Sequence, residues 1–106
     1  IHVWDLVEAH RLALLRLRAG GGSVVMNCGY GKGSSVRQVI DAVQAASGAT
    51  FDVRLGERRP GDMPEVLAAN DVILRELNWQ PKHQDLNVIV RHALDWEAAL
   101  ARRNRI

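Results

Sequence analysis

Cysteine, aromatic residues and long apolar runs are scarce in this sequence of 106 residues, and each shortage excludes a class of protein. Cys28 is the sole cysteine, so neither an internal disulfide nor a cysteine-based metal site can form. Five aromatic residues are too few for a platform on which nucleic-acid bases stack. The longest run without charge, from Ala19 to Gly31, is rich in glycine and shorter than the roughly 20 apolar residues of a membrane span.

An excess of charge of one sign is also missing. Residues 1–53 carry five basic and four acidic side chains, and residues 54–106 carry nine and eight. Because neither half could follow a phosphate backbone, we expect no nucleic-acid partner, and the lack of an apolar span predicts no membrane partner. No two histidines stand three to five residues apart, the spacing of a metal-binding pair, so we expect no metal site.

What remains is the composition of an ordinary globular chain. Hydrophobic residues make up 47% and charged residues 25% of the sequence. A chain of this length can bury one modest core, so we expect a single domain over residues 1–106. The sequence starts at Ile1 in a helical pattern without a signal peptide, which predicts a piece of a longer, cytoplasmic protein whose lone cysteine stays reduced.

Periodicity and capping residues predict four helices and two strands. Asp5 and Ser35 are each followed three residues later by Glu or Gln, which indicates capping boxes at two helix starts, and Asp85 is suited to begin another helix. The predicted helices cover about residues 5–17, 35–47, 70–77 and 85–100. Apolar and alternating patterns predict strands at residues 23–28 and 51–55.

Together, strand 23–28, helix 35–47 and strand 51–55 predict a strand–helix–strand unit with packed helices, and therefore an α/β fold. Two parallel strands in one sheet would need a right-handed crossover. A sheet of two strands is marginal, so we expect its other strands upstream or on another chain. The unpaired strand edge and the apolar helix faces also predict that the chain self-associates.

The glycine-rich turn Gly29–Ser34 admits two interpretations. It lies between a predicted strand and a predicted helix, as a dinucleotide fingerprint does, and Asp52 follows about twenty residues later. The match is incomplete, because Ser34 occupies the place of the third glycine and Asp52 falls inside a predicted strand. A structural turn is favoured over a nucleotide site. For Cys28, core packing is favoured over a role as nucleophile.

Arg59-Pro60-Gly61-Asp62 is the most informative stretch of the sequence. Proline in the second place and glycine in the third fit a type II turn, which would bring Arg59 and Asp62 to its two ends. A guanidinium there could bind a diphosphate through paired hydrogen bonds, and a carboxylate could accept from sugar hydroxyls. The alternative is a surface ion pair of little energetic value, and the residues alone favour it.

Four stretches in the same order and spacing resemble UDP-glucose 4-epimerases of the extended short-chain dehydrogenase group. The family's segments YIHVxDLAxAH, NLGxGxGxSV, RRxGD and xELGW resemble residues 1–10, 27–36, 58–62 and 75–79. The RRxGD loop is the more specific of these, whereas IHVxDL also occurs in related nucleotide-sugar enzymes. Around residues 67–72 the sequence departs from the family's Ala-Asp-x-Ser.

The resemblance implies the C-terminal, substrate-binding part of an isomerase that interconverts UDP-glucose and UDP-galactose. In the family, an N-terminal Rossmann domain holds NAD and the catalytic Tyr-x-x-x-Lys, so this chain is expected to hold no cofactor and no catalytic residue and to be inactive alone. The family's diphosphate contact maps to Arg59, its ribose contact to Asp62 and a wall of its sugar pocket to Val66. The implied partners are a UDP-sugar and the missing Rossmann domain.

Two alternatives stay open. The chain could belong to another nucleotide-sugar epimerase, dehydratase or decarboxylase of the same group. It could also be a free-standing, non-catalytic module that only binds or oligomerises. In the family, a small residue at the position of Val66 is associated with N-acetylated sugars, so Val66 leaves the choice of UDP-sugar open.

Overall fold

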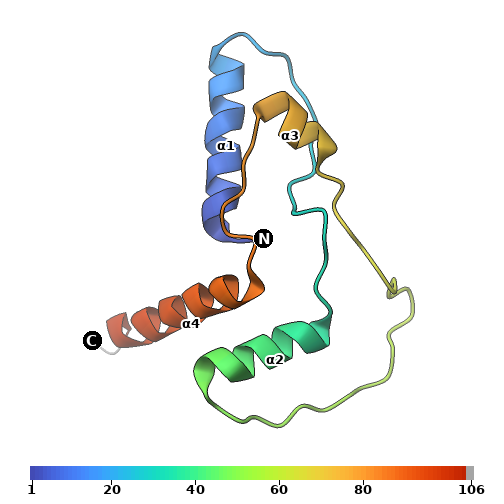
Figure 1. The fold of residues 1–106 in the computed structure, drawn as a ribbon, viewed down its shortest axis with the longest axis vertical. Coiled ribbons are helices and arrows are strands. Elements are labelled where there is room, and N and C mark those ends of the chain that lie inside the picture. The colour runs from blue at the N-terminus through green and yellow to red at the C-terminus, as the bar shows by residue number, and fades with distance from the viewer. Residues whose placement is uncertain (105–106) are drawn as a thin grey trace. The chain divides into compact units, whose positions relative to one another are not determined.

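The computed structural model describes residues 1–104, in which four α-helices follow one another (Figure 1). They are α1 (Val3–Arg18), α2 (Val36–Ser47), α3 (Asp71–Leu77) and α4 (Leu86–Arg103). The chain divides into two compact units. Unit 1 consists of Ile1–Gly33 and Leu67–Gln84 and holds α1 and α3; unit 2 consists of Ser34–Val66 and the residues from Asp85 onward and holds α2 and α4.

The predicted strand–helix–strand unit is wrong. Residues 23–28 and 51–55 have no regular secondary structure, and residues 1–104 contain no strand. A strand exists only when its N–H and C=O groups pair with a neighbouring strand, and an apolar pattern along one segment does not supply that neighbour. Val25 is accordingly 94% exposed and Leu55 78% exposed. The described fold is all-helical rather than α/β.

Unit 1 is built around the packing of α1 against α3. Its core consists of Ala9, Ile73, Leu77 and Trp79, and the indole of Trp79 is only 1% exposed. Several partly buried side chains pack against this core: Leu12, Ala13, Met26, Cys28 and Tyr30. The interpretation of Cys28 as a packing residue is therefore confirmed, and burial also raises the pKa of its thiol, which disfavours the nucleophilic thiolate.

The start of α1 differs from the prediction. His2, not Asp5, occupies the N-cap position, and its Nδ1 accepts a hydrogen bond from the backbone N–H of Trp4 over 3.0 Å. Asp5 lies in the first turn of the helix with its carboxylate directed inward and is 2% exposed. Histidine is not among the residues that favour N-caps, so the sequence pattern assigned the cap to the nearest carboxylate.

Unit 2 is built around the packing of α2 against α4. The predicted capping box at Ser35 is confirmed, because its Oγ accepts from the N–H of Gln38 over 3.2 Å and the Gln38 side chain accepts from the N–H of Ser35 over 2.7 Å. Gly48 ends α2 with a φ of 65°. Asp85 caps α4 as predicted, accepting from the backbone N–H of Asn87 over 2.8 Å.

Candidate functional site

Residues 59–62 form the predicted tight turn, which lies in unit 2. The backbone N–H of Asp62 donates to the carbonyl oxygen of Arg59 over 3.2 Å, and Gly61 has a φ of 86°. A positive φ at the third place of a type II turn is adopted by glycine without steric cost. The turn brings Arg59 and Asp62 together at its two ends, as the sequence predicted.

The two charged side chains of this turn form an exposed ion pair. Nε of Arg59 lies 3.3 Å from Oδ2 of Asp62, and the two side chains are 85% and 43% exposed. Such a pair contributes little to stability, so exchanging it for contacts with a ligand costs little. Val66 is not part of this pair; it stands four residues further on and is 74% exposed.

The segment that precedes α3 packs against the glycine-rich turn of unit 1. A Cβ added to Gly29 would lie 2.8 Å from the Cβ of Ala68, and one added to Gly31 would lie 3.2 Å from the side chain of Asn70. Asn70 also donates from Nδ2 to the carbonyl oxygen of Gly29 over 3.0 Å. This packing explains why positions 29 and 31 are glycine. It favours the interpretation of the segment as a structural turn over its interpretation as a nucleotide site.

The most elaborate arrangement of polar groups in unit 1 surrounds the buried carboxylate of Asp5. Its Oδ2 accepts from the Tyr30 hydroxyl over 2.7 Å and from the backbone N–H of His83 over 2.9 Å. Its Oδ1 accepts from the backbone N–H of Lys82 over 2.9 Å and lies 3.3 Å from Nδ1 of His83. The carbonyl oxygen of Asp5 accepts from Nε1 of Trp79 over 3.0 Å. We call these residues the Asp5 cluster: Asp5, Tyr30, Trp79, Lys82 and His83.

These hydrogen bonds determine the ionisation of the cluster. Burial by itself raises the pKa of Asp5, but the hydrogen bonds from Lys82, Tyr30 and His83 outweigh it and lower the pKa to about 2. Burial is also the main reason why the pKa of Tyr30 is raised to about 12, and the Asp5 carboxylate adds to that effect. Asp5 is therefore a charged acceptor and Tyr30 a neutral donor over the whole physiological range.

Sequence reasoning missed the Asp5 cluster. A signal for it was present, because Asp5, Ala9 and Ala13 recur at intervals of four and share one face of α1. A carboxylate on an apolar helix face is seldom buried without partners. Those partners, Tyr30 and His83, come from segments 25 and 78 residues away and carry no local pattern that points to Asp5.

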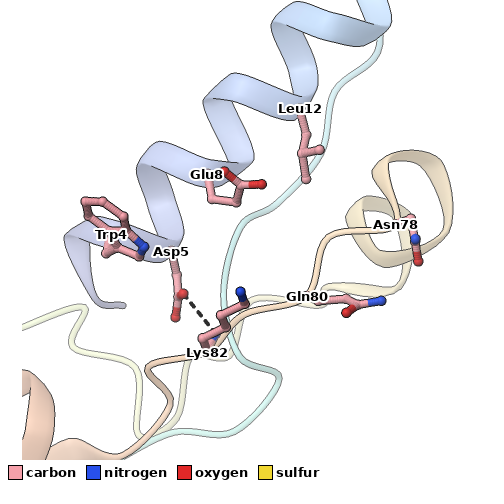
Figure 2. A pocket seen from close by; sticks show the side chains of 7 residues that line it. All are labelled: Trp4, Asp5, Glu8, Leu12, Asn78, Gln80 and Lys82. Atoms are coloured by element: carbon pink, nitrogen blue, oxygen red, sulfur yellow. Dashed lines mark hydrogen bonds between the residues drawn. The ribbon is translucent and has the colours of Figure 1, made fainter.

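A cleft of about 460 Å³ opens beside the cluster in unit 1. Figure 2 shows the side chains of α1 on one of its sides and those of the segment that follows α3 on the other. The lining residues are Trp4, Asp5, Glu8, Leu12, Asn78, Gln80 and Lys82. Asn78 ends α3 in the left-handed conformation, with a φ of 49°, which turns the chain toward the buried Trp79.

Among residues 1–104, no three His, Cys, Asp or Glu side chains gather as metal ligands would. None of the helices in this part of the chain combines the length and apolarity needed to cross a bilayer.

Many known proteins are similar to this chain, and three of them illustrate the similarity. A UDP-glucose 4-epimerase of Azospirillum brasilense is 53% identical over 100 residues, which are 94% of this chain and 29% of that protein. A solved UDP-glucose 4-epimerase from Stenotrophomonas maltophila, with bound NAD and formylated UDP-arabinopyranose, has a TM-score of 0.87 at 38% identity over 97% of this chain and 30% of its own. The UDP-Glc/GlcNAc 4-epimerase of Campylobacter jejuni has a TM-score of 0.79 at 46% identity over 93% and 30%.

This chain is related to one segment of the UDP-glucose 4-epimerases. The predicted resemblance is thereby confirmed both in sequence and in fold. The chain spans about 30% of the length of the UDP-glucose 4-epimerases it matches, which are isomerases of nucleotide sugars. No protein-family model matches it.

Proposed function

We propose that these 106 residues serve as the single UDP-sugar-binding domain of a UDP-glucose 4-epimerase, the isomerase that interconverts UDP-glucose and UDP-galactose. The observation that carries the proposal is the Arg59–Asp62 turn, which forms as Pro60 and Gly61 predict, at the position of the family's RRxGD loop, within a chain 53% identical to such an enzyme. The coverage of the relatives supports a C-terminal segment that works together with a Rossmann domain.

Each proposed site residue has chemistry that suits its part of the ligand. The guanidinium of Arg59 is planar and can donate two parallel hydrogen bonds to diphosphate oxygens. The carboxylate of Asp62 can accept from ribose hydroxyls. Val66 offers an apolar side chain, 74% exposed in the chain alone, that would form a wall of the sugar pocket.

The cofactor is assigned to the rest of the enzyme. NAD supplies reversible oxidation of the sugar carbon. It is bound in the Stenotrophomonas structure, of which this chain matches 30%. The glycine-rich turn of this chain does not fit NAD, because Ala68 and Asn70 already pack against Gly29 and Gly31. We therefore place NAD outside this chain. We propose that the catalytic residues also lie in the rest of the enzyme and that the whole enzyme is cytoplasmic.

The identity of the sugar is the open part of the proposal. The Campylobacter relative is described as acting on both UDP-Glc and UDP-GlcNAc, and the Stenotrophomonas enzyme holds a UDP-arabinopyranose derivative. Val66 is of intermediate size, so it favours neither the plain nor the N-acetylated sugar. A related nucleotide-sugar epimerase would use the same Arg59 and Asp62 contacts.

A chimera tests the proposal directly. This chain replaces the matching segment of the Azospirillum enzyme, to which it is 53% identical, and conversion of UDP-galactose to UDP-glucose is measured. We expect conversion in the chimera and its loss when the segment is deleted. A folded chimera that holds NAD but neither binds UDP nor converts the sugar contradicts the proposal.

A matched pair of variants tests whether UDP binding by the chimera depends on the Arg59–Asp62 turn. Arg59 and Arg54 are both exposed arginines of unit 2 paired to an aspartate, Asp62 and Asp52 respectively. Arg59→Ala should weaken UDP binding by the chimera, whereas Arg54→Ala should leave it unchanged. Equal effects of the two changes would mean that only the general charge of this segment matters.

A further inference from the structure

An apolar groove lies over the core of unit 1. Its floor is made of Ala9, Ile73 and Leu77, which are three of the four core residues of this unit and are all buried. The groove has a volume of about 180 Å³. Since a cavity of ~150 Å³ with apolar walls holds a benzene molecule, this groove has room for about one large apolar side chain.

The walls of the groove are apolar as well. The wall residues are Leu6, Ala13, Val24, Met26 and Cys28. No Asp, Glu, Lys or Arg is among the lining residues, and the ring of His10 at its edge places Nδ1 2.8 Å from the carbonyl oxygen of Leu6 in its own helix. Because a charged or strongly polar group would lose its hydration here without gaining a charged partner, the groove suits an apolar side chain.

The relatives indicate what covers this groove. The matching segment makes up 94% of this chain but 29% of the Azospirillum enzyme, and 97% of this chain but 30% of the Stenotrophomonas enzyme. Most of each relative therefore has no counterpart here. A groove that opens directly onto buried core side chains, with apolar walls around it, is typical of a surface that another folded part covers.

We propose that the groove of unit 1 receives an apolar side chain from the part of the enzyme that this chain lacks, so that unit 1 and that part share one core. The proposal rests on the proposed place of the chain within a longer epimerase, and not on the Arg59–Asp62 turn. A second copy of this chain is the competing occupant, which the experiment separates from the first.

The test compares the chimera with the chain alone. Unit 2 is present in both proteins, so a difference between them comes from the added part. Val24→Lys places an ammonium in the groove at a side chain that is 39% exposed in the chain alone. We expect it to lower the melting temperature of the chimera by about 5 °C or more, because the charge is buried there. The chain alone should lose less than about 3 °C, because the ammonium reaches water.

Leu15→Lys is the matched control. Leu15 is 46% exposed, does not line the groove and shares a face of α1 with the exposed ion pair of Glu8 and Arg11. A lysine there should change the melting temperature of either protein by less than about 3 °C.

A second measurement needs no substitution. The thiol of Cys28 lines the groove and is partly exposed in the chain alone. Its alkylation by iodoacetamide is followed by mass spectrometry of the peptide that contains it, and rates in urea correct for intrinsic reactivity. We expect alkylation of Cys28 to be at least about tenfold slower in the chimera, because a covered thiol reacts only while the interface is open.

Each outcome decides one question. Equal shifts for Val24→Lys and Leu15→Lys in the chimera, or equal alkylation rates in the chimera and the chain alone, overturn the proposal. It is also overturned if Val24→Lys abolishes self-association of the chain alone but leaves the melting temperature of the chimera unchanged, since the groove is then a contact between copies. Neither measurement uses UDP, so a folded chimera that does not bind UDP contradicts the proposed function and not the role of the groove.

Discussion

The hydroxyl of Tyr30 donates to the carboxylate of Asp5 over 2.7 Å, a bond between residues 25 positions apart. The two groups shift each other's ionisation in opposite directions. Burial and the neighbouring carboxylate raise the pKa of Tyr30 to about 12, while the bonds that Asp5 accepts overcome burial and lower its pKa to about 2. The bond therefore keeps a neutral donor and a charged acceptor from acid to alkaline pH, and it ties α1 to the glycine-rich turn.

Acid should weaken the chain through Asp5. The folded pKa of about 2 lies below the ordinary value of 3.8, so the contribution of Asp5 is complete above that value and disappears as pH falls toward 2. The shift corresponds to about 2 kcal/mol of unfolding free energy. Urea unfolding of the full chain between about pH 5 and about pH 2 measures it. Asp5→Asn should flatten this part of the profile, and identical profiles for both proteins would exclude Asp5 as its cause.

Gly31 should not tolerate a side chain. Its φ of 69° disfavours an L-residue, and a Cβ would approach Asn70 to 3.2 Å. We expect Gly31→Ala to lower the unfolding free energy by about 1–2 kcal/mol. Gly22→Ala is the matched control, because a Cβ there meets no atom within 4 Å and the change reduces only the freedom of the unfolded chain. Equal stability of the two variants in thermal unfolding would contradict the close packing of the turn.

Arg59 should contribute the largest share of UDP affinity among the three proposed site residues. Charge-assisted hydrogen bonds contribute about 1.5–3 kcal/mol each, so Arg59→Ala in the chimera should weaken UDP binding roughly ten- to a hundredfold. Arg59→Lys should recover part of the loss, because an ammonium cannot donate a parallel pair of bonds. Asp62→Asn should weaken binding less, since an amide still accepts from a hydroxyl.

Calorimetry with UDP, on variants whose melting temperatures match that of the parent chimera, measures these affinities. Bound NAD, read from absorbance after denaturation, should be the same in all three variants because the cofactor is assigned to the rest of the enzyme. An unchanged UDP affinity in Arg59→Ala would mean that the turn takes no part in UDP binding.

The 106-residue chain alone should not convert UDP-glucose. Its one tyrosine, Tyr30, is followed four residues later by Ser34, so the sequence contains no Tyr-x-x-x-Lys. Without a positioned proton-transfer group, the reaction lacks its acid–base step. Incubation with UDP-glucose and NAD, followed by chromatography of the nucleotide sugars, should show no UDP-galactose above a protein-free blank. Turnover would mean that this chain holds a catalytic group of its own.

The chain alone should also self-associate. Large apolar side chains are exposed in both units, with Val25 at 94% and Val36 at 77%. Exposed apolar surface of this kind drives association. The mass from analytical ultracentrifugation should rise with concentration, and Val25→Lys should reduce the rise if residues 23–28 take part. A monomer mass at all concentrations would argue against the prediction.

Most of the helices were predictable because their signals are local. The Ser35 capping box, the Asp85 cap and the stop at Gly48 depend on residues within one helical turn of each other, and the structure confirms all three. The turn at Arg59–Asp62 was predictable for the same reason, since Pro60 and Gly61 supply its backbone angles themselves. The roles of Arg59, Asp62 and Val66 toward a UDP-sugar remain predictions, which came from the family resemblance and not from periodicity.

Apart from the N-cap of α1, which His2 occupies, the predictions that failed concerned partners distant in the sequence. Residues 23–28 and 51–55 have the apolar patterns of strands, but a strand needs a neighbour to complete its hydrogen bonds, and the described chain supplies none. Asp5 has the side chain and spacing of a helix cap. Its carboxylate is nevertheless buried, because it accepts hydrogen bonds from the amides of Lys82 and His83 and from the hydroxyl of Tyr30. Sequence by itself determined both ends of α2, the start of α4 and the turn at Arg59–Asp62, because these depend on neighbours along the backbone. Tertiary structure alone decided which carboxylate is buried and which apolar segments do not pair as strands, because burial and pairing depend on groups that only folding brings together.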